Sequence, residues 1–239
     1  MNDFVAFFTY LSSTPLFGLT ATLGAYVLAS AVYLRLGSNP WANPVLWSVV
    51  LLVSLLLLTG MPYEKYFSGA QFIHFLLGPA VVALAWPLWL RRGMLVRHGK
   101  ALLLAALVGL LSGCGLAVAL GWALGLPPEV LRSLAPKAIT APVAMGIAQS
   151  IRGLPELAAI FVLLTGLIGA IGGQYVLNAL KVREPAVRGF ALGAQSHGFG
   201  TARAWHVNPD AGAFAGLAMG MQALLGAALI PLVAALFGR

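Results

Sequence analysis

The sequence predicts an all-α polytopic membrane protein, and three observations support this prediction. Of the 239 residues, 60% are hydrophobic and only 8% are charged, whereas a soluble globular domain is about half apolar and about a quarter charged. Several segments reach the ~20 apolar residues that a membrane-spanning helix needs. The sequence lacks the alternating pattern of a transmembrane barrel, so helices must satisfy the backbone inside lipid. We therefore expect one integral-membrane domain over residues 1–239, embedded in a lipid bilayer.

Eight segments have the apolarity expected inside a membrane, and seven of them are predicted to span it fully. The remaining segment, Glu129–Ile151, is the fifth along the chain and is predicted to be broken or re-entrant. Pro136 and Pro142 interrupt helical hydrogen bonding, and Lys137 is costly in contact with lipid. Protein or water must therefore surround this segment. The seven expected spans are Thr14–Leu34, Val45–Met61, Gly69–Leu90, Ala101–Gly125, Pro155–Leu180, Arg188–Val207 and Gly212–Phe237.

Basic residues between the segments predict the orientation, because cytoplasmic loops of membrane proteins are rich in Lys and Arg. Clusters at 91–100 and 181–188 are both expected in the cytoplasm. An even number of crossings must then separate them, which again indicates that segment 129–151 does not cross. This topology puts Asp210 outside and Arg239 inside. In the alternative, the arginines of the second cluster serve function rather than topology. The net charge of +8 follows from such loops, so no nucleic-acid partner is expected.

Small residues recur every four positions in three segments. Examples are the rows Gly109–Gly125, Thr165–Gly173 and Gly212–Gly220. Such rows let helix backbones approach closely in lipid, where no hydrophobic effect joins one helix to another. They predict a compact helical bundle.

Ionisable residues inside the apolar segments are the first candidates for a functional site, because they are expensive in a membrane. Lys137 lies in the broken segment, His197 and Arg203 lie in the seventh, and His74 lies in the third. Cationic or protonatable donors of this kind suit an anionic small ligand. In the alternative, Lys137 and Arg203 extend to the membrane interface, and His197 is a buried histidine bonded to a carbonyl.

Helix interruptions provide the second set of candidates. A helix that begins inside the membrane presents free N–H groups and the positive end of its dipole to an anion. Thr140-Ala-Pro142 is a predicted helix start of this kind, with a hydroxyl at the cap and proline in the first turn. Gly78-Pro79 is a second predicted break. The third is Ser196-His-Gly-Phe-Gly-Thr201, where Gly198 and Gly200 allow a ligand to approach the backbone.

Enzyme motifs were not found in the sequence. It contains no His-Glu-x-x-His helix, no phosphate-binding loop and no Cys-x-x-Cys pair. We therefore expect no catalytic activity, no metal and no cofactor. The single Cys114 is expected to be a small buried core residue.

Seven motifs together cover nearly the whole chain, and they begin at Pro15, Leu77, Pro136, Leu163, Arg188, Ser196 and Gly212. In the order and spacing of these motifs the sequence resembles the LrgB/CidB/YohK family of bacterial membrane proteins, which are called antiholin-like or holin-like. The family usually has Ser-Val-Thr-Thr-Pro after the lysine, whereas this chain has Ala138, Ile139 and Ala141 around Thr140. Two hydroxyls are therefore missing from the expected site.

The resemblance implies two competing functions in the bacterial inner membrane. One is control of murein hydrolase export and autolysis, with an LrgA/CidA-like small membrane protein as partner. The other is transport of small monocarboxylates, because the plastid glycolate/glycerate translocator resembles a fusion of LrgA-like and LrgB-like parts and bacterial members are linked to pyruvate. The buried cationic residues beside helix breaks favour a carrier for a pyruvate-, glycolate- or glycerate-like acid. Proton coupling, a homo-oligomer and the role of the small partner stay open, and the holin/antiholin-like regulator is the alternative.

In the carrier interpretation each candidate residue has a role. Lys137 and Arg203 supply positive charge, Thr140 and the backbone at Pro142 bind the carboxylate, and His197 binds the substrate or carries a proton. The remaining contributors to the expected binding site are Ser196, Gly198, Gly200 and Thr201, with Gly78 and Pro79 supporting a helix break.

Overall fold

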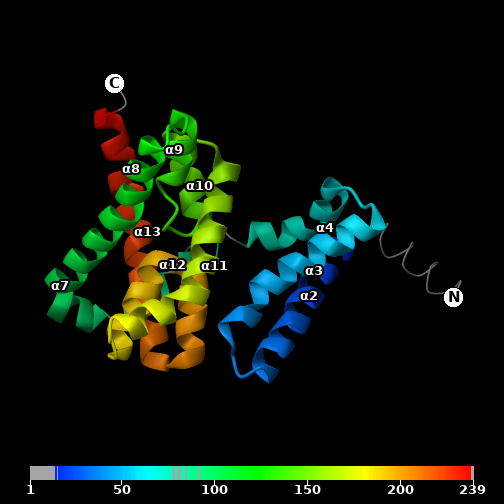
Figure 1. Ribbon diagram of the computed structural model, residues 1–239, viewed down its shortest axis with the longest axis horizontal. Helices are drawn as coiled ribbons and strands as arrows, with labels where there is room; N and C mark the ends of the chain where they lie inside the picture. Colours follow the sequence, from blue (N-terminus) through cyan, green and yellow to red (C-terminus); the bar gives the residue numbers. More distant parts are fainter. Residues whose placement is uncertain are drawn as a thin grey trace, which may run out of the picture. The chain divides into compact units, whose positions relative to one another are not determined.

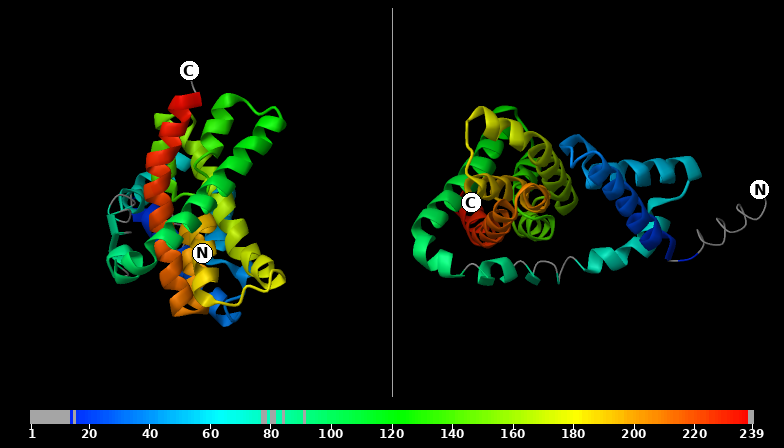
Figure 2. Two further views of the ribbon diagram at one scale, coloured as in Figure 1. Left: turned by 90° about the vertical axis from the view of Figure 1, so that its left-hand side faces the viewer. Right: turned by 90° about the horizontal axis from the view of Figure 1, so that it is seen from below.

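The computed structural model describes residues 14, 16–76, 79, 82–83, 85–90 and 92–237, and the regular elements within these residues are all helices. The chain divides into two compact units, Met1–Ala80 and Val81–Arg239. Their helices are drawn in Figures 1 and 2. The helices that are long and apolar enough to cross a membrane are Leu16–Arg35, Val96–Ala123, Pro155–Ala179 and Pro209–Leu236.

The first unit packs around its first helix. Helix α2 contacts both α3 and α4. Gly18 lets the backbones of α2 and α4 approach, because a Cβ there would meet the Tyr66 carbonyl. The Thr22 hydroxyl also lies 2.8 Å from the Tyr66 hydroxyl. The elements of this unit are α2 (Leu16–Arg35), the 3-10 turn η1 (Pro40–Ala42), α3 (Pro44–Thr59) and α4 (Tyr63–Phe75).

The second unit carries the longest helices. Helices α7 and α8 continue one another through the π-helical segment η2, while His98 breaks the helical geometry near the start of α7 (φ −117°, ψ 15°). The elements are α6 (Ala85–Leu90), α7 (Arg92–Leu110), η2 (Leu111–Gly115), α8 (Leu116–Ala123), α9 (Pro128–Leu134), α10 (Ala141–Ser150), α11 (Pro155–Ala179), α12 (Pro185–Val207) and α13 (Pro209–Phe237).

Local sequence explains where several of these helices begin. Asn208 precedes α13, and its side-chain oxygen accepts hydrogen bonds from the N–H groups of Asp210 (2.8 Å) and Ala211 (3.1 Å). Pro209 follows at the first helical position, where a missing N–H costs nothing. Asn43 and Pro44 start α3 in the same way.

The described helices match some expected spans and not others. Helices α2, α11 and α13 correspond to the expected spans that begin at Thr14, Pro155 and Gly212. Helices α7 and α8 together correspond to the expected span that begins at Ala101. Helix α3 has only 16 residues. The expected third span at 69–90 is not one helix among the described residues, because α4 ends at Phe75 and α6 begins at Ala85. Gly78 lies outside the described residues, while Pro79 has helical geometry and an exposed side chain.

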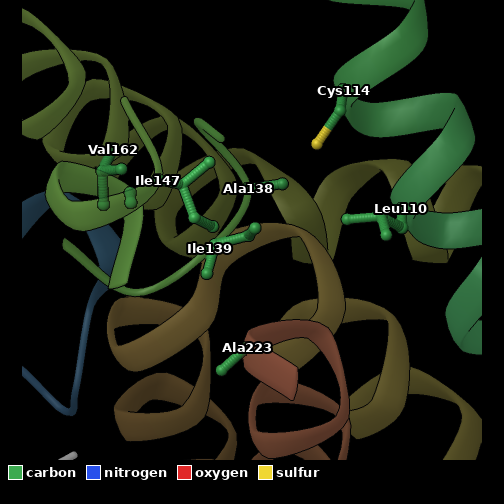
Figure 3. Packing of buried hydrophobic residues seen from close by; sticks show 8 residues of the cluster. Leu110, Cys114, Ala138, Ile139, Ile147, Val162 and Ala223 are labelled. Atoms are coloured by element: carbon green, nitrogen blue, oxygen red, sulfur yellow. The ribbon is translucent and has the colours of Figure 1, made fainter. Parts of the chain in front are cut away.

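A cluster of buried apolar side chains forms the core of the second unit (Figure 3). Leu110 and Cys114 come from α7 and η2, Ala138 and Ile139 from the stretch between α9 and α10, and Val162 from α11. Cys114 is 7% exposed, so the prediction of a buried core cysteine is confirmed. The core therefore lies where the predicted broken segment meets the long helices.

Candidate functional site

The predicted break between α9 and α10 is present, and the chain folds back there. No helix is assigned between Ala135 and Thr140. After α10 the chain returns to the end of α9, because the Leu154 N–H donates to the Ser133 hydroxyl oxygen at 2.7 Å. Gly153 passes so close that a Cβ on it would lie 2.9 Å from the Ser133 nitrogen. We call residues 133–154 hairpin A and residues 138–140 its tip.

Helix α12 contains a second reversal, at His197. Its backbone angles there (φ 40°, ψ −126°) are far from helical and lie in the left-handed half of φ/ψ space. Gly200 lies against the carbonyl of Leu192, eight residues earlier, whereas residues eight apart in a straight helix are about 12 Å apart. The Thr201 hydroxyl donates to the His197 carbonyl at 2.8 Å. We call residues 185–208 hairpin B and residues 196–198 its tip.

Contacts with α13 show the two directions of hairpin B. In its first half, Gly189 lies against Ala211 and Gly193 lies against the backbone at Ala215. Both residue numbers rise together, so this half runs parallel to α13. In the second half the order reverses, because Trp205 lies against Gly212 and Thr201 against Met219, farther along α13.

The expected full span at Arg188–Val207 is therefore wrong. Hairpin B enters and leaves at one end of the second unit, since Gly189 and Ala211 are neighbours. As a result, Asp210 lies at the same end as the basic segment 181–188, not at the opposite end as the sequence predicted. Figure 1 shows this end below, together with the start of α7, and shows α9 and the end of α13 above. The physical reason is that small residues admit the α13 backbone along one face of the hairpin.

The two hairpins contact neighbouring parts of α13, and we call the region of α13 between Met219 and Gly226, with the two tips, the junction. Hairpin B reaches Met219 through Thr201, and the tip of hairpin A reaches Gly226, where the Ile139 side chain occupies the space beside the glycine. Seven residues of helix rise about 10 Å. The tips are also joined through α11, because the His197 Nε2 lies 3.0 Å from the Val162 carbonyl and Val162 packs in the same cluster as Ile139.

Polar groups of hairpin A face this junction. The Lys137 ammonium lies near enough to Cys114 and to the His197 ring to act on the charged forms of both. Thr140 occupies the N-cap position of α10 without a side-chain capping bond, and Pro142 is in the first turn. The Thr140 hydroxyl oxygen is buried and makes no hydrogen bond among the described residues. A positive charge, a hydroxyl and a helix N-terminus together can hold a small anion.

The residues of hairpin B have different surroundings. Ser196 is 2% exposed and packs against Gly169, while the His197 ring is 3% exposed and packs against Gly166 and edge-on to Phe199. Gly198 is exposed, with open space around its Cβ position. The alternative of a buried histidine bonded to a carbonyl thus describes His197 in this state.

Arg203 lies apart from the other candidates. Its Nη2 donates to the Gln174 side chain at 2.9 Å, and Gln174 is twelve residues along α11 from Val162, or about 18 Å at 1.5 Å per residue. The structure therefore brings together Lys137, Thr140 and His197 but not Arg203.

Two glutamines that bond carbonyls of α7 were missed by the sequence analysis, and of these Gln222 is the one that lies between the two tips. Gln195 Nε2 donates to the Gly109 carbonyl at 2.7 Å, and Gln222 Nε2 donates to the Ala106 carbonyl at 2.9 Å. Gln222 is the only amide side chain in the apolar sequence of α13. A lone polar residue within a spanning helix was the signal that could have identified it.

Long apolar helices, four of them long enough to cross a membrane among the described residues, define this chain as a helical membrane protein. Its sequence matches the model of the LrgB-like family over residues 22–236, and the chain belongs to that family. It is 37% identical to the uncharacterized protein YxaC of Bacillus subtilis over 90% of this chain and 94% of that protein. It is also 33% identical to an uncharacterized protein of Haemophilus influenzae, over 80% and 83% of the two chains.

A third relative carries a functional name. The holin-like protein CidB of Staphylococcus aureus is 31% identical over 83% of this chain and 87% of its own length. The resemblance seen in the sequence is thereby confirmed. No solved structure matches this chain.

Proposed function

We propose that this chain is a holin/antiholin-like protein of the bacterial inner membrane that regulates murein hydrolase export and autolysis, together with an LrgA/CidA-like small membrane protein. The observation that carries this proposal is the similarity to the holin-like protein CidB over most of both chains. The names of the relatives favour this function over the carrier that the sequence pattern first indicated.

The test is an autolysis measurement in a host that lacks its own members of the family. The chain is expressed alone, with the small partner, and as Gly193→Leu, which removes hairpin B from α13 and so serves as a misfolded control. Detergent-induced lysis and hydrolase activity in the medium should change with the wild-type chain only. Unchanged lysis at matched membrane levels, with and without the partner, would refute the proposal.

A carrier for small monocarboxylates is a second candidate, supported by the junction of the two hairpins. Interrupted helices in transporters hold substrates near the middle of the membrane, where helix N-termini face anionic groups. Lys137 and the N-cap Thr140 lie at such an interruption. A lytic pore does not need a half-buried lysine beside two hairpin tips, whereas a carboxylate carrier does.

Flux through reconstituted vesicles separates the two candidates. Labelled pyruvate, glycolate and lactate are offered to proteoliposomes with and without the small partner, beside uncharged solutes of similar size. Saturable flux of the acids alone supports a carrier. Equal leakage of charged and uncharged solutes contradicts the carrier and agrees with a pore.

A further inference from the structure

Gln222 has a buried oxygen that nothing in the described part of the chain satisfies. The residue is 1% exposed, its Nε2 donates to the Ala106 carbonyl, and its Oε1 has no hydrogen-bond partner. The Ala106 carbonyl oxygen can only accept a hydrogen bond, so the nitrogen of the Gln222 side-chain amide, and not its oxygen, must face it. The Oε1 is therefore a buried acceptor to which no donor among the described residues binds. Buried polar atoms without partners are rare and call for a specific explanation.

Gln222 lies between the two hairpin tips. On α13 it stands three residues after Met219, which hairpin B contacts through Thr201. It stands four residues before Gly226, which hairpin A contacts through Ile139. Residues three and four apart share one face of a helix, so Gln222 faces the side on which both hairpins pack. Figure 3 shows Ala223 of this part of α13 together with Ile139 and Leu110, which belong to the same buried cluster.

A second unsatisfied oxygen belongs to the tip of hairpin A. Thr140 follows Ile139, and its buried hydroxyl also has no hydrogen-bond partner among the described residues. A hydroxyl both donates and accepts, whereas the Gln222 Oε1 only accepts. The pair fits a ligand that offers an acceptor to Thr140 and a donor to Gln222.

A metal cation does not fit these oxygens. Lys137 places a positive charge within electrostatic range of the same junction. The described acidic residues are all exposed, so no carboxylate among them is available to balance a cation. These residues are Glu64, Glu129, Glu156, Glu184 and Asp210.

We propose that Gln222 is a specificity-determining residue that accepts a hydrogen bond from the hydroxyl of a small hydroxy-carboxylate, while Lys137, Thr140 and the N-terminus of α10 hold its carboxylate. This inference rests on the carrier candidate above. An oxo acid with the same carbon skeleton has an acceptor where the hydroxy acid has a donor, so it leaves the Gln222 oxygen unpaired. Rejection of an analogue that lacks the required hydrogen-bonding group is the stronger form of discrimination.

The test compares three acids that differ at one position. Lactate carries the donor, pyruvate carries an oxo oxygen, and 2-methoxypropionate keeps the oxygen but lacks the donor. Each acid competes with labelled lactate for uptake into proteoliposomes, and each is also added to the purified protein in a thermal-stability measurement. The wild-type chain should prefer lactate to both others by about tenfold, as expected for one hydrogen bond to a buried acceptor.

Two variants complete the experiment. Gln222→Met keeps length and removes the acceptor, so it should weaken lactate alone and bring the three acids close together. Gln195→Met is the matched control, because Gln195 also bonds a carbonyl of α7 but is only half-buried, and it should keep the wild-type preference.

The failures of the two proposals are distinguishable. Equal affinity of the wild-type chain for lactate and 2-methoxypropionate overturns the role of Gln222 while leaving the carrier intact, and this result needs no variant that folds. An unchanged preference in folded Gln222→Met does the same. Absence of both saturable uptake and ligand-specific stabilisation with all three acids refutes the carrier and the inference together.

Discussion

Replacing Gly193 with alanine should destabilise the protein, because this glycine lets hairpin B lie directly on α13. The added methyl carbon would lie 2.6 Å from the Cα of Ala215, and ordinary contacts begin at 3.4 Å. The Ala215 carbonyl oxygen lies closer still, so helices α12 and α13 would have to part by at least roughly 0.8 Å, and overpacking of this kind costs about 1–3 kcal/mol. In an isolated helix the same change would stabilise by up to about 1 kcal/mol. We therefore expect a net loss of stability.

Gly172 provides the matched control, because it lies in α11 with nothing within 4 Å of its Cβ position. Gly172→Ala should be neutral or slightly stabilising. The melting temperatures of both variants are measured in detergent by loss of the monodisperse peak in size-exclusion chromatography. If Gly193→Ala melts at or above the temperature of Gly172→Ala, the parallel packing of hairpin B on α13 is wrong.

Three further changes test other parts of the structure. Single cysteines at Ala186 and Asp210, in a background without the native cysteine, should react alike with an impermeant thiol reagent in intact cells. Reaction of only one of them would contradict the reversal at His197. Ser133→Ala leaves the N–H of Leu154 without its acceptor and should cost about 0.5–1.5 kcal/mol of stability, the net value of one hydrogen bond, so an unchanged melting temperature would show that hairpin A is closed differently. In the carrier assay, Lys137→Gln should reduce acid uptake at an unchanged melting temperature, and equal uptake would mean that this lysine does not contact the substrate.

The break in hairpin A could be predicted from the sequence because its cause is local. Pro136 and Pro142 remove backbone donors six residues apart, and Thr140 marks the following helix start. These properties need no knowledge of the rest of the chain, and the helix boundaries at Leu134 and Ala141 agree with them.

The reversal in hairpin B has a tertiary cause, which the sequence does not display. The motif around Gly198 and Gly200 indicated an interruption, but a glycine-rich stretch is compatible with a kink as well as with a return of the chain. Two contacts distinguish the return of the chain from a kink. The His197 ring lies in hydrogen-bond distance of the Val162 carbonyl, and Gly193 packs directly against α13. Both partners are distant in sequence. The prediction of a full span was wrong because the apolarity and length of a segment indicate that it is buried, but not whether the chain continues or turns back inside it.

The packing of the hairpin A tip has a consequence for biosynthesis. Ile139 fits beside Gly226 of α13, which the ribosome adds more than eighty residues later. Until then the non-helical stretch that carries Lys137 lacks its contacts with α13. Its backbone groups would be exposed to lipid on that side, which is strongly unfavourable. The tip must therefore wait in the protein-lined or aqueous space of the insertion machinery, or at the membrane surface, and enter the bundle only after α13 is in place. A nascent chain stopped before α13 should accordingly be a good substrate for membrane quality-control proteases, while one stopped after it should be resistant.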